Sequence, residues 1–304
     1  MINKDSKIFL AGDRSWTAVE LKNILIQNGF NNIVGCNTDN LDLRDNSEVE
    51  DFFSLHNPEF VILTAAKIEK NIEELQTKAF ELLNDNLIIA INMINSSLKY
   101  GVKKFVYFSS DITLPYYSDG REVDEEDLLS APFKENKQAY SLAKIIGTYL
   151  CRYSNRKFSS PRFISLLPCY IYGNFGKGLL FSIYKEIKHA KDNNLSKVDF
   201  WGTGDLKYKF IHSRDLAEAV FFVLFNQMRY DCYIVAPEKQ IFKYELVSMI
   251  AKQVGYEGEV FFDEEKKLSS GVNASPKRIM SEGWQSKITL EKGIVDMISW
   301  HGGI

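Results

Sequence analysis

Short apolar runs alternate with amphipathic segments through the first half of the chain. The runs are brief and nearly continuous, as in strands buried on both faces, whereas the segments between them repeat apolar residues at helical spacing. Strands are expected at 7–11, 33–36, 58–66 and 103–110, and helices at 16–29 and about 80–100. This alternation predicts right-handed βαβ units around a parallel sheet, with ligands at the carboxyl ends of its strands.

The second half starts with the same pattern and then becomes less regular. A helix at 138–156 and a strand at 162–167 are followed by helices near 179–190, 214–227 and 243–255, strands at 197–201, 233–236 and 259–262, and two short C-terminal helices. We therefore expect an α/β fold, a Rossmann-type doubly wound parallel sheet with a smaller α/β C-terminal substrate lobe. The large domain is expected at 1–170, with a partial return of the chain near 205–235, and the lobe mainly at 171–304.

Composition narrows the range of functions. The 304 residues are 45% hydrophobic and carry a net charge of −3, which argues against nucleic acid as a main partner. The four cysteines and four histidines show no metal-ligand spacing, so no metal site is expected. Because no apolar run reaches the roughly 18 residues of a membrane span and no signal peptide is evident, we expect a cytoplasmic protein without membrane contact.

The segment YSLAK places Tyr140 and Lys144 four residues apart. Residues at this spacing share one face of a helix, so both side chains can point into one cleft. A nearby cation favours the phenolate, which brings the tyrosine closer to a useful pKa for proton transfer. The alternative is a surface lysine beside a half-buried tyrosine.

Ser109 and Ser110 follow a predicted buried strand. A hydroxyl at the end of such a strand could hydrogen-bond a carbonyl oxygen and share the charge that develops there. Simple turn formation is the alternative explanation for two serines at this place. A strand-end serine, YSLAK and an N-terminal βαβ unit coincide by chance much less often than any one of them occurs alone.

With these features the sequence resembles the extended short-chain dehydrogenase/reductase superfamily, and within it the GDP-L-fucose synthase group. The resemblance spans almost the whole chain. It rests on KIFLAGDR at 7–14, LDLRD at 41–45, LTAAK at 63–67, the helix containing Asn86, KKFVYFSS at 103–110, YSLAK at 140–144, LPCYIYG at 167–173, FWGTG at 200–204, KFIHSRDLA at 209–217, and EGW at 282–284 followed by ITLEKGI.

The resemblance implies a catalytic set. Tyr140 would protonate the substrate oxygen, Lys144 would hold the nicotinamide ribose and bias the pKa of the tyrosine, and Ser109 would polarise the carbonyl. Hydride would come from the cofactor. The cofactor-binding positions implied are Gly12, Arg14, Ser15, Trp16, Asp42, Leu43, Ala65, Ala66, Lys67, Tyr140, Lys144, Pro168 and Ile171.

The cofactor expected is NADPH/NADP rather than NADH. Arg14 is well placed for a 2′-phosphate, and no acidic residue closes the second strand at Cys36. Two features depart from the family. Its glycine fingerprint survives only at Gly12, with Ser15 and Ala18 at the other two positions, and Cys36 replaces a basic residue that helps to grip the 2′-phosphate.

The residues for epimerisation also depart from the family. Fucose synthases carry a cysteine two residues after the catalytic serine and a histidine beyond the YG turn, and these exchange protons next to the ketone. Here the first position is Asp111, and no histidine follows Gly173 before His189, which lies too far along a helix. Since proton exchange at carbon needs a positioned base and acid, we expect reduction without epimerisation. Asp111 is either a substitute base or a carboxylate that binds sugar hydroxyls or caps a turn.

The expected substrate clamp is altered as well. The family's arginine before FIH corresponds to Tyr208, flanked by Lys207 and Lys209, its asparagine corresponds to Tyr170, and its C-terminal basic pair falls on Gly271 and Val272. Lys207 or Lys209 could bind a diphosphate as a point charge, or KYK could be a solvated strand face. Trp201 matches an aromatic residue near the sugar, or belongs to a core.

The sequence thus predicts an NADPH-dependent reductase for the 4-keto group of a GDP-linked deoxy sugar, with Asp111, Tyr170, Trp201, Lys207 and Lys209 at the substrate. One alternative is a bifunctional C3/C5-epimerase and 4-reductase, and another is a non-catalytic dinucleotide-binding subunit. The family often pairs through two long helices, so we expect a homodimer.

Overall fold

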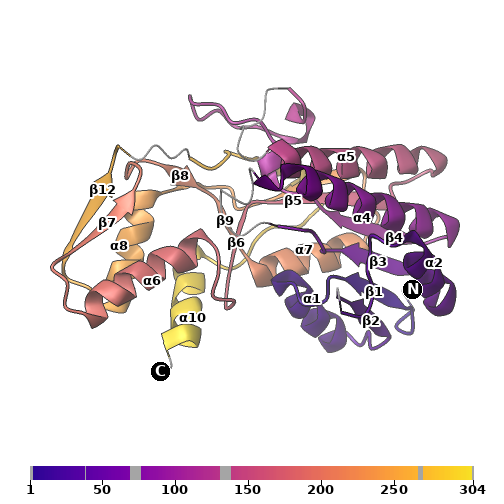
Figure 1. The fold of residues 1–304 in the computed structure, drawn as a ribbon, viewed down its shortest axis with the longest axis horizontal. Helices are drawn as coiled ribbons and strands as arrows, with labels where there is room; N and C mark the ends of the chain where they lie inside the picture. Colours follow the sequence, from indigo (N-terminus) through magenta and orange to yellow (C-terminus); the bar gives the residue numbers. More distant parts are fainter. Residues whose placement is uncertain (1–2, 38, 69–76, 131–137, 266–269, 303–304) are drawn as a thin grey trace.

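The computed structural model describes residues 3–37, 39–68, 77–130, 138–265 and 270–302. Its centre is a six-stranded sheet of order β10-β5-β4-β3-β1-β2, in which every strand pair is parallel (Figure 1). The strands are β1 (Ile8–Ala11), β2 (Ile33–Cys36), β3 (Phe60–Leu63), β4 (Lys104–Phe108), β5 (Phe163–Pro168) and β10 (Cys232–Val235). This doubly wound arrangement confirms the predicted fold class.

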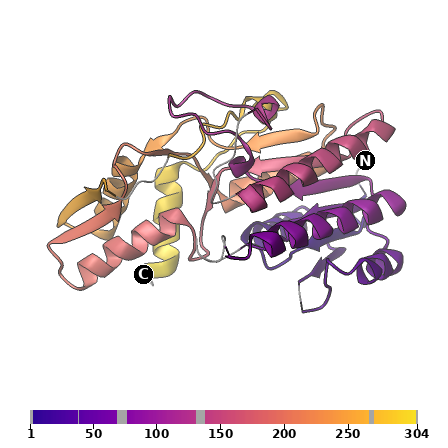
Figure 2. The same cartoon turned by 45° about the horizontal axis from the view of Figure 1, so that its top comes forward.

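Helices cover both faces of the sheet because its strands bury successive side chains on opposite sides. Leu10 faces a core shared with α1 (Trp16–Gln27) and α7 (Ser213–Phe225). Phe9 faces the other core, with α2 (Asn46–His56), α4 (Ala79–Lys99) and α5 (Gln138–Ser154). Figure 2 shows α4 and α5 side by side. The period-2 alternation within β1 thus builds two hydrophobic layers.

Helix α2 was not expected from the apolar pattern. Only Val49 and Phe53 are buried in it, so it presents about one core residue per turn. Its start is fixed instead by Asp45, whose side chain accepts hydrogen bonds from the backbone of Ser47 and Glu48. Polar capping at this helix therefore compensates for a weak hydrophobic signal.

A third hydrophobic cluster lies outside the large sheet, in the part of the chain to the left in Figure 1. It packs between α6 (Leu179–Asp192), α8 (Lys243–Val254) and α10 (Leu290–Gly302). Three small strand pairs accompany it: β7 (Lys197–Trp201) with β12 (Glu259–Asp263), β8 (Lys207–Tyr208) with β11 (Ile241–Phe242), and β6 (Tyr170–Tyr172) with β9 (Phe210–His212). The domain boundary at residue 170 stays a prediction.

The described ranges show no feature typical of a membrane span or a metal centre. Among those residues no helix has the length and apolar character that crossing a membrane requires. Nor do three or more His, Cys, Asp or Glu side chains gather there in a way that could hold a metal ion. All four cysteines are free and buried.

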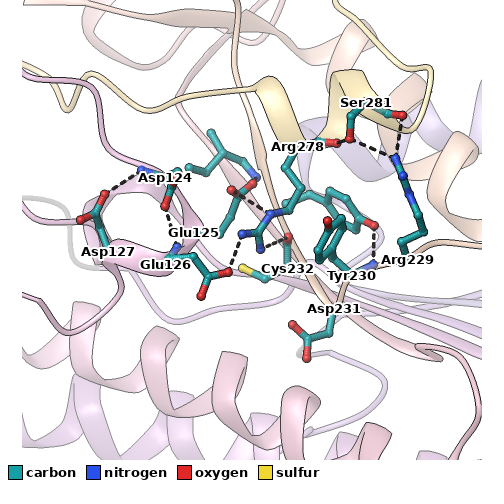
Figure 3. A network of polar contacts seen from close by, with 12 residues as sticks. Asp124, Glu125, Glu126, Asp127, Arg229, Tyr230, Asp231, Cys232, Arg278 and Ser281 are labelled. Atoms are coloured by element: carbon teal, nitrogen blue, oxygen red, sulfur yellow. Dashed lines mark hydrogen bonds and ion pairs between the residues drawn. The ribbon is translucent and has the colours of Figure 1, made fainter.

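A buried ion pair contacts the edge strand β10 (Figure 3). Glu125, in the short helix η2 (Glu125–Asp127), accepts a hydrogen bond from the backbone N–H of Ile234 at 2.7 Å. Its other oxygen lies 3.2 Å from Nε of Arg278, in the helix α9 (Lys277–Ser281). Arg278 also contacts the carbonyl of Cys232 and the carboxylate of Glu126. These contacts give the edge of the sheet polar partners and connect it to two segments distant in sequence.

We predict that Arg278→Met lowers the free energy of unfolding by about 3 kcal/mol, because it leaves the carboxylate of Glu125 buried without its cation. The Glu125 side chain is only 1% exposed. The neighbouring Lys277→Met is the control, since it removes an ion pair to Glu122 whose lysine is 76% exposed, at a cost below about 1 kcal/mol. Urea unfolding of both variants measures the difference, and equal stabilities would contradict the role given to the pair.

Candidate active site

A cavity of about 520 Å³ opens at the carboxyl ends of the parallel strands. Loops after β3, β4 and β5, the first turn of α1 and one face of α5 surround it. Ten of the predicted site residues line it, namely Ser15, Trp16, Ala66, Ser109, Asp111, Tyr140, Lys144, Pro168, Tyr170 and Ile171. The cavity therefore lies where doubly wound folds bind their ligands.

Gly12 makes the turn between β1 and α1 and has a φ of +96°. A Cβ atom there would lie 2.6 Å from the backbone nitrogen of Ala65 and 2.7 Å from Oγ1 of Thr64, so only glycine fits. Thr64 donates a hydrogen bond to the carbonyl of Gly12 at 2.8 Å and accepts one from Ser15 at 2.9 Å. Two neighbouring loops are thereby held in close contact.

Helix α1 begins at this turn with Ser15 as its N-cap and no acidic residue in its first turn. Its free backbone N–H groups can bind a diphosphate, and the glycine turn allows the close approach that a dinucleotide needs. The substitution of Ser15 for the family's second glycine leaves this arrangement intact. Trp16 lines the cavity and stacks on Phe175 with ring centroids 5.3 Å apart. The described residues therefore fit a dinucleotide at this end of the cavity.

The loop after β3 is fixed by Asn86 of α4. Its side chain accepts a hydrogen bond from the backbone nitrogen of Lys67 and donates one to the carbonyl of the same residue. Ala65 is held further back, by a hydrogen bond from its nitrogen to the carbonyl of Ala11. Small side chains and an anchored backbone leave this wall of the cavity open to a ligand.

Lys144 is buried beneath the cavity floor. Its Nζ donates a 2.7 Å hydrogen bond to the carbonyl of Phe108, the last residue of β4. The same ammonium lies 5.6 Å from the ring centroid of Tyr140, one helical turn earlier. Burial lowers the pKa of Lys144 to about 7. The predicted convergence of the two side chains is thus observed.

The expected effect on the pKa of Tyr140 is wrong for the protein alone. Burial raises this pKa to about 12, and the negative charge of Asp111 adds to the rise. Desolvation of the phenol and the charge of Asp111 outweigh any effect of the Lys144 cation, whose own pKa burial lowers to about 7. A phenol with a raised pKa keeps its proton at neutral pH, which suits a proton donor.

Ser109 and Asp111 line the cavity just after β4, close to α5. The backbone nitrogen of Ser109 donates to the carbonyl of Leu166 in β5 at 2.8 Å, which fixes its backbone. Asp111 begins the short helix η1 (Asp111–Thr113). Burial raises the pKa values of Tyr140, Cys169 and Tyr170, and the charge of Asp111 adds to each rise. All four residues line the cavity.

Six predicted cofactor-binding residues lie outside the cavity lining. Gly12 and Ala65 lie behind the lining, in the turn after β1 and the loop after β3 described above. Arg14 is exposed and pairs with Asp39 at 2.6 Å. Asp42 is held by Arg44, and Lys67 pairs with Asp85 at 2.9 Å. The side chain of a sixth residue, Leu43, is buried in the hydrophobic core, which leaves only its backbone for an adenine.

The predicted lysine clamp does not form in the cavity. Lys209, just before β9, is 1% exposed and donates to the carbonyl of Ala274 at 2.9 Å, so it connects the start of β9 to the segment around Ala274. Lys207 is exposed and stacks its ammonium over Phe242. Trp201 is 59% exposed and absent from the cavity lining. The resemblance implied all three as substrate-binding residues, and none of them is among the described residues that line the cavity, so that role stays a prediction.

Aromatic side chains occupy the place expected for the clamp. Tyr170 meets Tyr208 edge to face, with ring centroids 5.4 Å apart. Gly271 lies against both, because a Cβ atom at this position would be 3.0 Å from the Tyr170 ring. The wall where the family carries basic residues is therefore apolar and closely packed.

Sequence reasoning missed several residues of the site. Thr64, Tyr116 and Cys169 line the cavity but were not selected. Thr64 and Cys169 stand inside the quoted motifs LTAAK and LPCYIYG, so their place at strand ends was a usable signal. No pattern pointed to Tyr116, which follows an irregular segment.

Comparisons with known proteins agree with this geometry. The model of the NAD dependent epimerase/dehydratase family matches residues 11–235. A putative GDP-L-fucose synthase 2 from Arabidopsis thaliana is 30% identical over 99% of this chain and 93% of its own length. A GDP-mannoheptose C4 reductase from Campylobacter jejuni with NADP bound superposes with a TM-score of 0.86, at 27% identity, over 99% of this chain and 100% of that chain.

A second solved structure gives the same result. A GDP-D-glycero-L-gluco-heptose synthase from Campylobacter jejuni, in the presence of NADPH, has a TM-score of 0.89 and 26% identity, covering 99% of this chain and 100% of that chain. The resemblance to the GDP-L-fucose synthase group is thus confirmed over the whole fold.

We predict that Gly12→Ala weakens NADPH binding by about tenfold or more, because the added methyl group collides with the backbone of Ala65. Gly283→Ala is the matched control: Gly283 has a similar φ of +102° but no atom within 4 Å of the added carbon. Both variants carry the backbone strain, and only the first blocks the turn. Fluorescence titration with NADPH measures the affinities, and an equal loss in both would refute the steric argument.

Proposed function

Because the chain belongs to the NAD-dependent epimerase/dehydratase family, we propose that this NADP-dependent oxidoreductase reduces the 4-keto group of a GDP-linked deoxy sugar without epimerising it. The observation that carries the proposal is the convergence of Ser109, Tyr140 and Lys144 on one cavity beside a dinucleotide turn. We place the reaction in the cytoplasm, in the biosynthesis of a surface polysaccharide.

Proton transfer is the task of Tyr140. When bound, NADPH supplies the hydride that reaches the carbonyl carbon. Tyr140 donates its phenolic proton to the carbonyl oxygen, so that the C=O double bond becomes a C–H and an O–H bond, and the phenolate regains a proton from solvent. Its raised pKa holds the donor in the protonated form. Ser109 donates a hydrogen bond to the same oxygen and stabilises its developing charge.

The coenzyme is assigned to the α1 side of the cavity. Gly12, Ser15 and the first backbone N–H groups of α1 would bind the diphosphate, and Lys144 the nicotinamide ribose. Asp42 and Leu43 would face adenine, while Ala65, Ala66, Lys67, Pro168 and Ile171 would form the remaining walls. Arg14 would bind the 2′-phosphate in place of its surface partner Asp39. An exposed ion pair is weak, so the more highly charged phosphate would displace the carboxylate.

The absence of a proton-exchange pair supports reduction alone. No histidine is among the described residues that line the cavity. Cys169 lies there, but burial and the charge of Asp111 raise its pKa well above the ordinary thiol value, which disfavours a thiolate base. Asp111 is assigned to hydroxyl groups of the sugar.

The GDP group is assigned from the names of the relatives and from the aromatic residues at the edge of the substrate lobe. Tyr170, Tyr208 and Gly271 would pack against the sugar and its diphosphate by shape, in place of the missing basic residues. Lys207, Lys209 and Trp201 would act on the nucleotide only after side-chain movement, because none lines the cavity.

The assembly expected from the family is a homodimer. Helices α4 and α5 lie side by side and expose Phe80, Ile91, Ile146 and Tyr153. Exposed apolar side chains on two adjacent helices would support pairing into a four-helix interface. This assignment stays a prediction.

We predict that the purified protein oxidises NADPH when given GDP-4-keto-6-deoxymannose, and that Tyr140→Phe reduces turnover by about a hundredfold or more while NADPH affinity is kept. Absorbance at 340 nm follows the reaction, and fluorescence titration gives the affinity. Full activity in Tyr140→Phe would refute the assigned mechanism. NADPH binding without turnover of any 4-keto sugar nucleotide would favour a dinucleotide-binding subunit, and no cofactor binding would exclude both.

We further predict no deuterium at C3 or C5 of the product when the reaction runs in D₂O, because the described residues that line the cavity include no histidine and Cys169 is disfavoured as a thiolate. NMR of the product detects the label. Deuterium at C3 or C5 that disappears in Asp111→Asn would establish the bifunctional alternative, with Asp111 as the base. With a pure reductase, the same variant is expected to raise the KM for the sugar nucleotide.

A further inference from the structure

Helix α5 carries a third polar side chain on the face that bears Tyr140 and Lys144. Thr148 follows Lys144 by one helical turn and is 2% exposed. Its Oγ1 lies 3.1 Å from Oγ of Ser109 and 3.0 Å from the carbonyl oxygen of Lys144. Oγ of Ser109 lies 3.5 Å from that same carbonyl. Two hydroxyl groups and one carbonyl thus form a closed, buried triangle beneath the cavity.

The triangle holds two hydroxyl protons, and their directions decide what Ser109 can do. If Thr148 donates to the carbonyl of Lys144, Ser109 can donate to Oγ1 of Thr148, and its proton then points away from the cavity. If Thr148 donates to Ser109, the proton of Ser109 has only the 3.5 Å contact to Lys144, at the limit of a hydrogen bond. That proton is then available to a carbonyl oxygen in the cavity.

The backbone groups next to Ser109 are already hydrogen-bonded, so they do not affect the direction of its hydroxyl proton. Its nitrogen is engaged by Leu166, and the preceding carbonyl of Phe108 accepts the ammonium of Lys144. The serine is therefore held on both sides, and its remaining freedom is rotation of the side chain and its proton. Thr148 is the described side chain that Oγ of Ser109 meets at an ordinary hydrogen-bond distance.

We propose that Thr148 is a positioning residue, which donates its proton to Ser109 and so directs the proton of Ser109 to the substrate carbonyl. The proposal rests on the reduction proposed above. A hydroxyl that accepts a hydrogen bond becomes a better donor, so the pair also polarises the carbonyl more strongly than serine alone. The competing explanation is a local one, in which Thr148 only bonds the carbonyl four residues earlier, as helical threonines commonly do.

Thr148→Val tests the proposal because it keeps the shape of the side chain and removes its hydroxyl. Expected is a fall in kcat of about tenfold, with the KM for the sugar nucleotide and the Kd for NADPH unchanged. Thr148→Ser keeps the donor and is expected to restore most of the activity. If the valine variant does not fold, Thr148→Cys replaces it in the comparison, because cysteine is similar in size to threonine and its thiol is only a weak hydrogen-bond donor.

A double-mutant cycle with Ser109→Ala separates the two explanations. If Thr148 acts through Ser109, Thr148→Val has no further effect on kcat once the serine hydroxyl is gone. The same fall in both backgrounds would overturn the proposal, and so would unchanged kcat in Thr148→Val or no rescue by serine. Absence of turnover in the unaltered protein would instead refute the proposed reduction, so the two failures are distinguishable.

Discussion

The hydrogen bond from the buried ammonium of Lys144 to the carbonyl of Phe108 determines how the site is arranged. A buried cation is costly, and its lowered pKa reflects that cost. The contact fixes α5 against the end of β4. It thereby places Tyr140, one turn before the lysine, and Ser109, one residue after the carbonyl, on the same cavity.

Other elements of the fold form the remaining walls of the cavity. Because all six strands are parallel, their carboxyl ends lie at one edge, and the turn at Gly12 brings α1 to the loop after β3. Burial at this edge has a chemical consequence. It favours the protonated phenol of Tyr140 and the neutral thiol of Cys169, so Tyr140 is suited to giving a proton and Cys169 is poorly suited to removing one.

The parts that sequence predicted are those with a repeated physical signal. The large sheet followed from continuous apolar strands, and Tyr140 with Lys144 followed from helical spacing. Helix α2 was missed because polar capping by Asp45 replaces an apolar face. Strands of two or three residues, such as β8 and β11, are too short for any period. The sequence around Lys209 does not reveal its hydrogen bond to the distant carbonyl of Ala274, and its role as a ligand stays a prediction. Thr148 could have been predicted from the sequence, because it follows Lys144 by the same four residues that separate Tyr140 from Lys144.

The most direct test of the account is the fate of the transferred hydrogen. NADPH deuterated at the transferable position of its nicotinamide would be reacted with GDP-4-keto-6-deoxymannose in ordinary water, and the product examined by NMR. The account predicts one deuterium at C4 of the sugar, with the configurations at C3 and C5 the same as in the substrate. A product without deuterium at C4 would contradict it.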